Sequence, residues 1–240
     1  MSERTIAAVA TPPGESSVGV IRISGEKAAE IADSVFFAVS GTPLSVLKGY
    51  SAAYGEIRDG DTVIDDAVAL VFKAPKSYTG EDVVEISVHG GALILRDTLR
   101  LLYKKGAFPA EPGEFTKRAF LNGKTDLARA ESIMGLISAK NESQLRLSRA
   151  AHLGKISEKI DGIISRLTSA DAAIAVYSDY PDEEIEGLDR ESFLSSLKAC
   201  AQDIEQMLLT YNAGRVLREG IETVIVGKPN VGKSTLFNRL

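Results

Sequence analysis

The sequence predicts an α+β protein with an amino-terminal mixed α/β domain, then a helical-bundle domain, then the start of a further α/β domain. Three observations predict this order. Strand-like runs alternate with helical ones up to about residue 120, the pattern is then almost wholly helical, and a short apolar run with a glycine-rich loop follows. The domains are expected at residues 1–120, 121–219 and 220–240.

The composition is that of an ordinary globular protein. Of 240 residues, 44% are hydrophobic and 25% charged, which excludes disordered, collagen-like and mucin-like classes. A net charge of −5 argues against a protein that binds nucleic acid over its whole surface. The chain shows neither a secretory signal nor an apolar run near the roughly 18 residues of a membrane span. Its one cysteine, Cys200, lies at helical spacing as a core residue, so we expect a soluble cytoplasmic protein without disulfides or a membrane partner.

Alternation of apolar and polar residues indicates the strands of the first domain. They are expected at residues 5–10, 18–23, 51–58, 62–73 and 83–88, with Asp59-Gly60 as a hairpin turn between the third and fourth. A helix face is predicted by five residues at helical spacing: Ala28, Ile31, Ala32, Val35 and Phe36. A second helix is expected at residues 91–105, closed by Gly106.

One stripe of a long helix is predicted in the second domain. Its residues are spaced alternately three and four apart: Leu153, Ile156, Ile160, Ile163, Leu167, Ala170, Ile174 and Tyr177. The stripe indicates either a seam inside an intramolecular bundle, which the short pattern ending at Pro181 favours, or an intermolecular coiled coil. An acidic connection at residues 182–186 then leads to a helix from Arg190 to about Arg218.

The strongest chemical signal lies in the third domain. Residues 223–226 are expected to form a buried strand, and residues 227–234, GKPNVGKS, match the phosphate-binding loop G-x-x-x-x-G-K-[ST]. In such a loop, backbone N–H groups surround the phosphates, Lys233 places an ammonium on the β- and γ-phosphates, and the Ser234 hydroxyl completes a Mg²⁺ shell. A helix whose positive end faces the phosphates is expected from Thr235.

The sequence lacks the other motifs that a nucleotide hydrolase needs besides this loop. Neither an Asp-x-x-Gly nor an Asn-Lys-x-Asp tetrapeptide occurs in the chain. We therefore expect the 240 residues to be a piece of a longer protein and to be inactive in hydrolysis by themselves. Pro229-Asn230-Val231, with Phe237-Asn238 after them, resemble the loop of translation-factor-related GTPases rather than that of ATPases.

Further motifs occur in a fixed order along the whole chain. They are AVATPPG (8–14), VGVIRISG (18–25), YTGEDVVE (78–85), HGG (89–91), PGEF (112–115), RAFLNGK (118–124), Asp126-Leu127, Ala130-Glu131, YPDEEI (180–185) and LREG (217–220). Together they resemble the MnmE family of tRNA-modification GTPases, also called TrmE.

The resemblance implies an amino-terminal folate-binding domain that forms a homodimer, a helical domain, and a GTPase domain inserted into the helical one. It implies a GTP hydrolase that works with the flavoprotein MnmG in a hetero-oligomer. Together they would modify carbon 5 of the wobble uridine of certain tRNAs, with 5-formyltetrahydrofolate or a related tetrahydrofolate as one-carbon donor. GTP hydrolysis, with Mg²⁺ and K⁺ bound, would drive the conformational change.

The folate contacts that the resemblance implies fall on Arg22, Glu85 and Lys124. Arg22 and Glu85 lie opposite apolar neighbours in alternating strands, and a carboxylate can accept from the N–H edge of a pterin. Lys124, at a helix end, would meet the glutamate tail. Without the family, each would be interpreted as a charge on a solvated face.

The resemblance also implies GTP contacts at Gly227, Asn230, Val231, Gly232, Lys233, Ser234 and Thr235. Asn230 matches the asparagine that helps to hold potassium, and Ser234 the magnesium ligand. No catalytic side chain is predicted.

Two other functions remain open. One is a stand-alone folate-binding module for one-carbon transfer. The other is a GTPase switch in ribosome assembly or signalling, with the first half only a dimerisation domain. The two histidines, His89 and His152, are too few and too far apart in sequence for a metal site and are expected to be structural.

Overall fold

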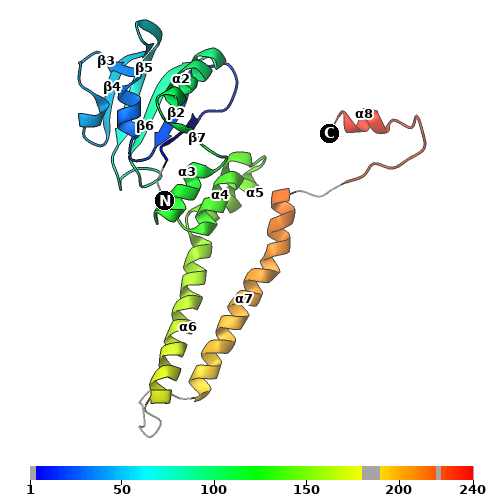
Figure 1. The fold of residues 1–240 in the computed structure, drawn as a ribbon. Helices are drawn as coiled ribbons and strands as arrows, with labels where there is room; N and C mark the ends of the chain where they lie inside the picture. Colours follow the sequence, from blue (N-terminus) through cyan, green and yellow to red (C-terminus); the bar gives the residue numbers. More distant parts are fainter. Residues whose placement is uncertain (1–3, 180–189, 220–222, 240) are drawn as a thin grey trace. The chain divides into compact units, whose positions relative to one another are not determined.

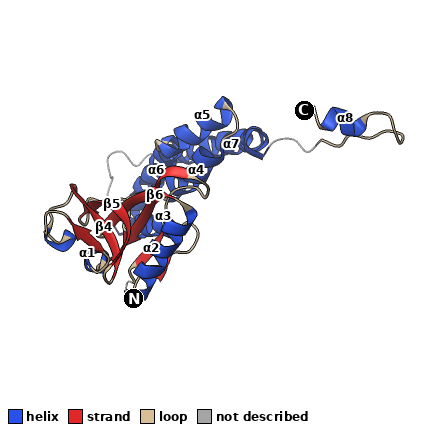
Figure 2. Cartoon of the chain, turned by 90° about the horizontal axis from the view of Figure 1, so that it is seen from above, coloured by secondary structure: helices blue, strands red, loops and turns tan. Residues whose placement is uncertain are grey.

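The computed structural model describes residues 4–179, 190–219 and 223–239. The chain divides into two compact units, residues 1–130 and 131–240. A mixed sheet with helices forms the first unit and helices form the second (Figures 1 and 2), which confirms the predicted fold class.

The first unit is built on one seven-stranded sheet. Its strands are β1 (Ile6–Val9), β2 (Ser16–Ser24), β3 (Phe36–Ala38), β4 (Ser51–Asp59), β5 (Thr62–Phe72), β6 (Val83–Gly90) and β7 (Phe108–Pro109). Their order in the sheet is β3-β4-β5-β6-β2-β1-β7, and every neighbouring pair is antiparallel except β1 with β7. The helices are α1 (Ala28–Asp33), α2 (Ala92–Lys104) and α3 (Glu114–Leu121), with a short 3₁₀ turn at Leu44–Val46.

The core lies between one face of this sheet and helices α1 and α2. Alternate side chains of the central strands are fully buried there, including Ile21 and Ile23 of β2 and Ile86 of β6. Each such side chain contributes roughly 1.5–3 kcal/mol by leaving water. Because strand side chains alternate between faces, the residues between these point to the opposite face of the sheet.

The first helix is shorter than its spacing predicts. Val35 and Phe36 are buried as expected, but α1 ends at Asp33 and Phe36 begins strand β3, paired with Ile57. The Asp33 carboxylate accepts from the backbone N–H groups of Leu44 and Ser45, at 2.5 and 3.0 Å. These bonds connect the end of α1 to the 3₁₀ turn at Leu44–Val46. Valine followed by two phenylalanines also favours a strand.

The second unit is helical. It contains most of α4 (Leu127–Ser138), then α5 (Glu142–His152), α6 (Lys155–Asp179), α7 (Arg190–Glu219) and the short α8 (Lys233–Phe237). Helices α6 and α7 pack side by side (Figure 1), with an ion pair between Arg166 and Asp203. Of the predicted stripe, Ile163 is buried in this contact, but five other members of the stripe in α6 are 40–57% exposed, so the stripe as a whole does not form a closed seam between the two helices. Cys200 on α7 is buried as expected.

The predicted stripe is wrong at its first residue. Leu153 lies outside α6, because α5 ends at His152 and Gly154, with φ of 86°, separates the two helices. The acidic connection at residues 182–186 and the YPDEEI motif lie outside the described residues. No helix of the described ranges is both long and apolar enough to cross a membrane.

Candidate functional site

Arg22 and Glu85 form an ion pair on the sheet face that points away from α1 and α2. They are direct partners in the register of β2 and β6, and Arg22 Nε donates to Glu85 Oε1 at 2.8 Å. Their side chains are only 24% and 21% exposed. The sequence placed them on the face opposite the apolar residues, as found, but neither charge is on a fully solvated surface.

Two aromatic rings flank the Arg22 guanidinium. Its carbon Cζ lies 4.8 Å from the centre of the Tyr78 ring and 5.5 Å from that of Phe115. Tyr78 comes from the connection between β5 and β6, and Phe115 from the first turn of α3. A cation over an aromatic face is stabilised by about 0.5–2 kcal/mol, the larger value when water is excluded. The rings therefore hold the guanidinium in place and shield it from water.

Some polar atoms of the Arg22–Glu85 pair make no contact with the described residues and are available to a ligand. Among the described residues, no contact uses the two terminal nitrogens of Arg22 or the Oε2 atom of Glu85. A guanidinium with free terminal N–H groups suits an oxyanion or carbonyl, and a free carboxylate oxygen suits an N–H edge. Together with the flanking rings, this combination fits a flat heterocycle that carries both donors and acceptors.

Lys124 lies beside the same connection between β5 and β6. Its ammonium donates to the backbone oxygen of Pro75 at 3.0 Å, and the residue follows the end of α3 at Asn122. The structure thus brings Arg22 and Glu85 into contact and places the Lys124 ammonium against the loop that carries Tyr78. Lys124 is exposed, so its ammonium is accessible to a negatively charged group.

The phosphate-binding loop has backbone turns typical of its motif. Asn230 and Gly232 take left-handed φ angles of 63° and 91°, and α8 begins at Lys233. The Lys233 ammonium donates to the backbone oxygens of Gly227 and Lys228, at 2.9 and 2.7 Å. The loop offers three side-chain groups that suit a nucleotide phosphate and its cations. The Lys233 ammonium can donate to phosphate oxygens, and the oxygens of the Ser234 hydroxyl and the Asn230 amide can bind cations.

Two predictions around this loop are wrong. Residues 223–226 form no strand, and Val224 and Val226 are 82% and 87% exposed, because no described strand pairs with them. A lone extended segment has no ladder partner and cannot bury its side chains. The following helix starts at Lys233 rather than at Thr235. Gly220, at the end of the LREG motif, lies outside the described residues.

His89 pairs with Asp65 rather than with Arg22 or Glu85 in the described part of the first unit. His89 Nδ1 lies 2.7 Å from Asp65 Oδ1, and its backbone N–H donates to Asp65 Oδ2 at 2.7 Å. The hydrogen bond to the Asp65 carboxylate raises the pKa of His89 above its ordinary value. Within the described ranges, no three His, Cys, Asp or Glu side chains are grouped closely enough to hold a metal ion.

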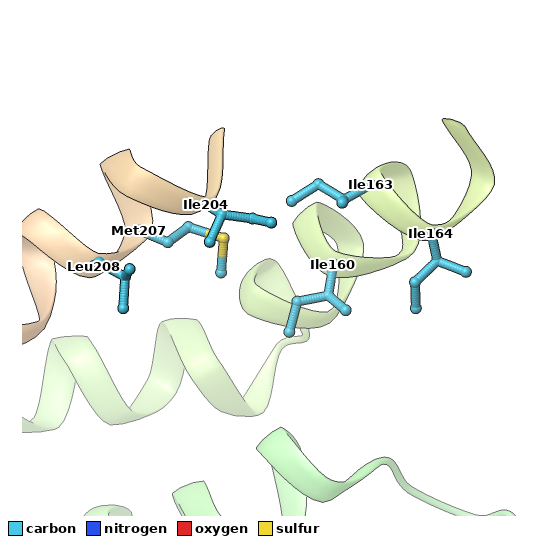
Figure 3. Close-up of a pocket in the computed structure, with 6 residues that line it drawn as sticks. All are labelled: Ile160, Ile163, Ile164, Ile204, Met207 and Leu208. Carbon is cyan, nitrogen blue, oxygen red and sulfur yellow. The ribbon is translucent and has the colours of Figure 1, made fainter. Parts of the chain in front are cut away.

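A pocket of about 380 Å³ opens between α6 and α7 (Figure 3). Only apolar side chains line it: Ile160, Ile163, Ile164, Ile204, Met207 and Leu208. It offers no donor or acceptor side chain for a phosphate or a pterin. We therefore do not assign it as the ligand site.

Sequence reasoning missed the aromatic half of the site around Arg22. Tyr78 and Phe115 lie in motifs that carry the family resemblance, but neither was predicted as a site residue. An aromatic residue in a loop, such as Tyr78, or after a Pro-Gly-Glu turn, such as Phe115, does not by itself indicate a binding site. Only the packing of α3 and the β5–β6 connection shows that both rings flank one arginine.

Comparisons with known proteins agree over the whole chain. The model described as "GTP-binding protein TrmE N-terminus" matches residues 5–124, and that described as "MnmE helical domain" matches residues 127–234. Three curated proteins called "tRNA modification GTPase MnmE" are similar to it. The protein from Carboxydothermus hydrogenoformans is 44% identical over 242 residues, which are 100% of this chain and 52% of that protein. Those from Clostridioides difficile and Bacillus subtilis are 42% and 40% identical over 236 and 239 residues, each covering 98% of this chain and 51% and 52% of the relative.

The chain thus spans about half the length of the curated relatives it matches. The amino-terminal model alone covers half of the chain, and the helical model covers most of the rest. The chain belongs to the MnmE family, also called TrmE.

Proposed function

We propose that this chain is the amino-terminal and helical part of a GTPase that modifies tRNA, and that its first unit binds a tetrahydrofolate. In this proposal the protein acts with the flavoprotein MnmG on carbon 5 of the wobble uridine. The one-carbon donor is 5-formyltetrahydrofolate or a related tetrahydrofolate, and GTP hydrolysis drives the conformational change.

The single observation that carries the folate proposal is the half-buried Arg22–Glu85 pair between two rings. Glu85 Oε2 is available to accept from the N–H edge of a pterin, and the terminal N–H groups of Arg22 are available to its carbonyl or to a formyl oxygen. The exposed ammonium of Lys124 would meet the carboxylates of the glutamate tail. A bound tetrahydrofolate supplies the one-carbon unit, and these three residues bind and orient it.

The phosphate-binding loop supports the GTPase half of the proposal. Lys233 would leave its two backbone oxygens for the β- and γ-phosphates, while Ser234 would hold Mg²⁺ and Asn230 would help to hold K⁺. Gly227, Val231, Gly232 and Thr235 would contribute backbone N–H groups. The relatives are called tRNA modification GTPases, which favours this activity over a switch in ribosome assembly.

Exposed apolar side chains on the sheet support the proposed homodimer. Tyr54 and Val68, partners in the register of β4 and β5, are 57% and 40% exposed on the sheet face away from α1 and α2. We propose that a second copy covers this face.

We also propose that residues 1–120 form the folate domain, 121–219 the first part of the helical domain, and 220–240 the start of the GTPase domain. Later residues of the longer protein would then cover the apolar pocket between α6 and α7.

The folate proposal is tested by isothermal titration of the purified chain with 5-formyltetrahydrofolate. We expect Arg22→Ala to bind about ten- to hundred-fold more weakly, because it loses a charge-assisted hydrogen bond worth roughly 1.5–3 kcal/mol. The variant should remain folded, with a loss of stability of about 1 kcal/mol, because Glu85 keeps only partial access to water.

The matched control is Arg96→Ala. Arg96 is 65% exposed on α2 and, within the described ranges, pairs only with its neighbour Asp97, so this variant makes the same change of charge away from the site. We expect its affinity for the folate to equal that of the unmodified chain. Equal binding by the Arg22 and Arg96 variants would remove Arg22 from the site, and absence of binding by the unmodified chain would refute the folate proposal itself.

A further inference from the structure

Arg118 on α3 uses its guanidinium entirely within the protein. Its Nη1 donates to both carboxylate oxygens of Glu81 at 3.1 Å, while Nε and Nη2 donate to Glu114 Oε1 at 3.3 and 2.9 Å. Nη2 also donates to the backbone oxygen of Arg4 at 2.8 Å. These contacts occupy the whole fork of N–H groups that a guanidinium carries, and only 14% of the side chain is exposed. Arg118 therefore has no donor left for a ligand and acts by holding protein groups together.

Glu81 carries this network into the connection between β5 and β6, residues 73–82, which we call the Tyr78 loop. Its Oε2 accepts from the Ser24 hydroxyl at 2.6 Å, and that hydroxyl lies 2.7 Å from the Thr79 hydroxyl. Ser24 and Thr79 are fully buried. Asn122, just after α3, donates from Nδ2 to the Thr79 backbone oxygen at 2.8 Å. The Tyr78 loop is thus bonded to β2 on one side and to α3 on the other.

The loop and the end of α3 are also in close contact. A Cβ atom at Gly80 would lie 3.0 Å from Asn122 Cβ and 3.2 Å from Lys124 Cγ, and φ at Gly80 is 81°. Only glycine accepts both the approach and the angle without strain. A displacement of α3 would therefore displace the loop as well.

This arrangement determines the surroundings of Arg22. The Tyr78 loop carries one of the two rings beside its guanidinium, and α3 carries the other at Phe115. Phe115 is three residues before Arg118, so both lie on the same side of the helix. The Tyr78 hydroxyl also lies 2.9 Å from that of Thr116. The spacing of the two rings thus depends on the contact between loop and helix.

Electrostatics make Arg118 the centre of that contact. It is the cation between two carboxylates, Glu81 on the loop and Glu114 on the helix. Burial would raise the pKa of Glu114, but the backbone N–H of Glu111 and the Arg118 guanidinium outweigh it and hold that pKa below its usual value. Without Arg118 the two carboxylates lose their shared counter-charge, and repulsion replaces attraction between loop and helix.

We propose that Arg118 is a positioning residue that holds the Tyr78 loop and α3 together and so sets the two rings on either side of Arg22. The ligand that benefits is the tetrahydrofolate of the proposed function, on which this part of the inference rests. The positioning itself is a property of the free protein and can be measured without any ligand.

The first test is hydrogen exchange of the free chain, followed by mass spectrometry of the peptides that contain residues 74–82. We expect Arg118→Ala to exchange faster there than the unmodified chain, with the β4–β5 hairpin unchanged. Arg96→Ala, the matched loss of an exposed arginine, should leave these peptides unchanged. Unchanged exchange at residues 74–82 in Arg118→Ala would overturn the proposal.

The second test is titration with 5-formyltetrahydrofolate. If the loop holds its competent position about one tenth of the time in Arg118→Ala, the apparent affinity falls about ten-fold. Arg118→Lys should restore less than half of this loss in free-energy terms, because an ammonium cannot bridge both carboxylates and the Arg4 oxygen at once. Full rescue by lysine would contradict a role for the guanidinium fork.

A double-substitution cycle separates positioning from general destabilisation. If Arg118 acts through the rings around Arg22, its removal costs less affinity in an Arg22→Ala background than in the unmodified chain. Strict additivity would overturn the proposal. If Arg118→Ala does not fold, Arg118→Lys replaces it in the exchange measurement and in the cycle. Asn122→Ala, which removes one bond to the loop at an exposed position, then checks the contact between loop and helix separately. If the unmodified chain and Arg96→Ala both fail to bind, the folate proposal fails, while hydrogen exchange still decides the role of Arg118.

Discussion

The site around Arg22 and the phosphate-binding loop are built in opposite ways. Arg22, Glu85, Tyr78 and Phe115 come from four separate segments, and the sheet and α3 bring them together. The phosphate-binding loop is one continuous segment whose turns and lysine contacts are local, and its flanking residues are almost wholly exposed. Local sequence is thus sufficient to shape a loop, whereas the environment of a side chain depends on long-range packing.

The largest expected effect is on GTP hydrolysis. We expect the 240-residue chain to release phosphate from GTP at least about a hundred-fold more slowly than a full-length family member, because loss of even one transition-state contact has such an effect. A coupled phosphate assay measures both rates, and Lys233→Ala in the longer protein should abolish turnover. Similar rates of phosphate release for the 240-residue chain and the full-length family member, with the Lys233 variant inactive, would mean that the local loop is sufficient for hydrolysis.

The next effect compares the two regions in stability. Ile21→Ala removes a fully buried side chain from the sheet and should lower the free energy of unfolding of the first unit by about 2–5 kcal/mol. Val226→Ala, at a position 87% exposed, should change stability by less than about 0.5 kcal/mol. Urea titrations followed by circular dichroism measure both. A large loss at Val226 would show that the segment before the loop packs against other residues.

The smallest expected effect is a pH dependence of stability that comes from His89, near the end of β6. Because Asp65 raises the pKa of His89 above its ordinary 6.5, the charged pair stabilises the folded unit fully below pH 6.5. That contribution is lost as the pH rises through the raised pKa of the folded state. We expect a small fall in the melting temperature between pH 6 and pH 8 that His89→Asn reduces. Asp65→Asn should reduce it equally, and an unchanged fall in both variants would exclude this pair as its cause.

The sequence predicted regular elements better than side-chain neighbourhoods. Alternation identified β2 and β6 and put Arg22 and Glu85 on the correct face, because strand geometry is a local property. It could not show that residues 63 positions apart are partners in one register, since register depends on which strands become neighbours.

Two of the errors have the same physical origin. Phe36 continues a helical spacing, but pairing with Ile57 makes it a strand residue. Residues 223–226 have the composition of a buried strand, yet a strand exists only beside another one. In both cases a partner distant in sequence decides the outcome, and the local pattern contains no information about that partner.

The bond from Arg118 to the backbone of Arg4 has a consequence for synthesis on the ribosome. These two residues are 114 positions apart, so one of them is among the first to leave the exit tunnel and the other emerges only after the last strand of the sheet. A chain grows at about 5–20 residues per second, and contacts of such long range close late in folding. A nascent chain can therefore assemble its hairpins early, but the surroundings of Arg22 are completed only when α3 has emerged. The completed surroundings of Arg22 then report that synthesis and folding of the first unit are finished.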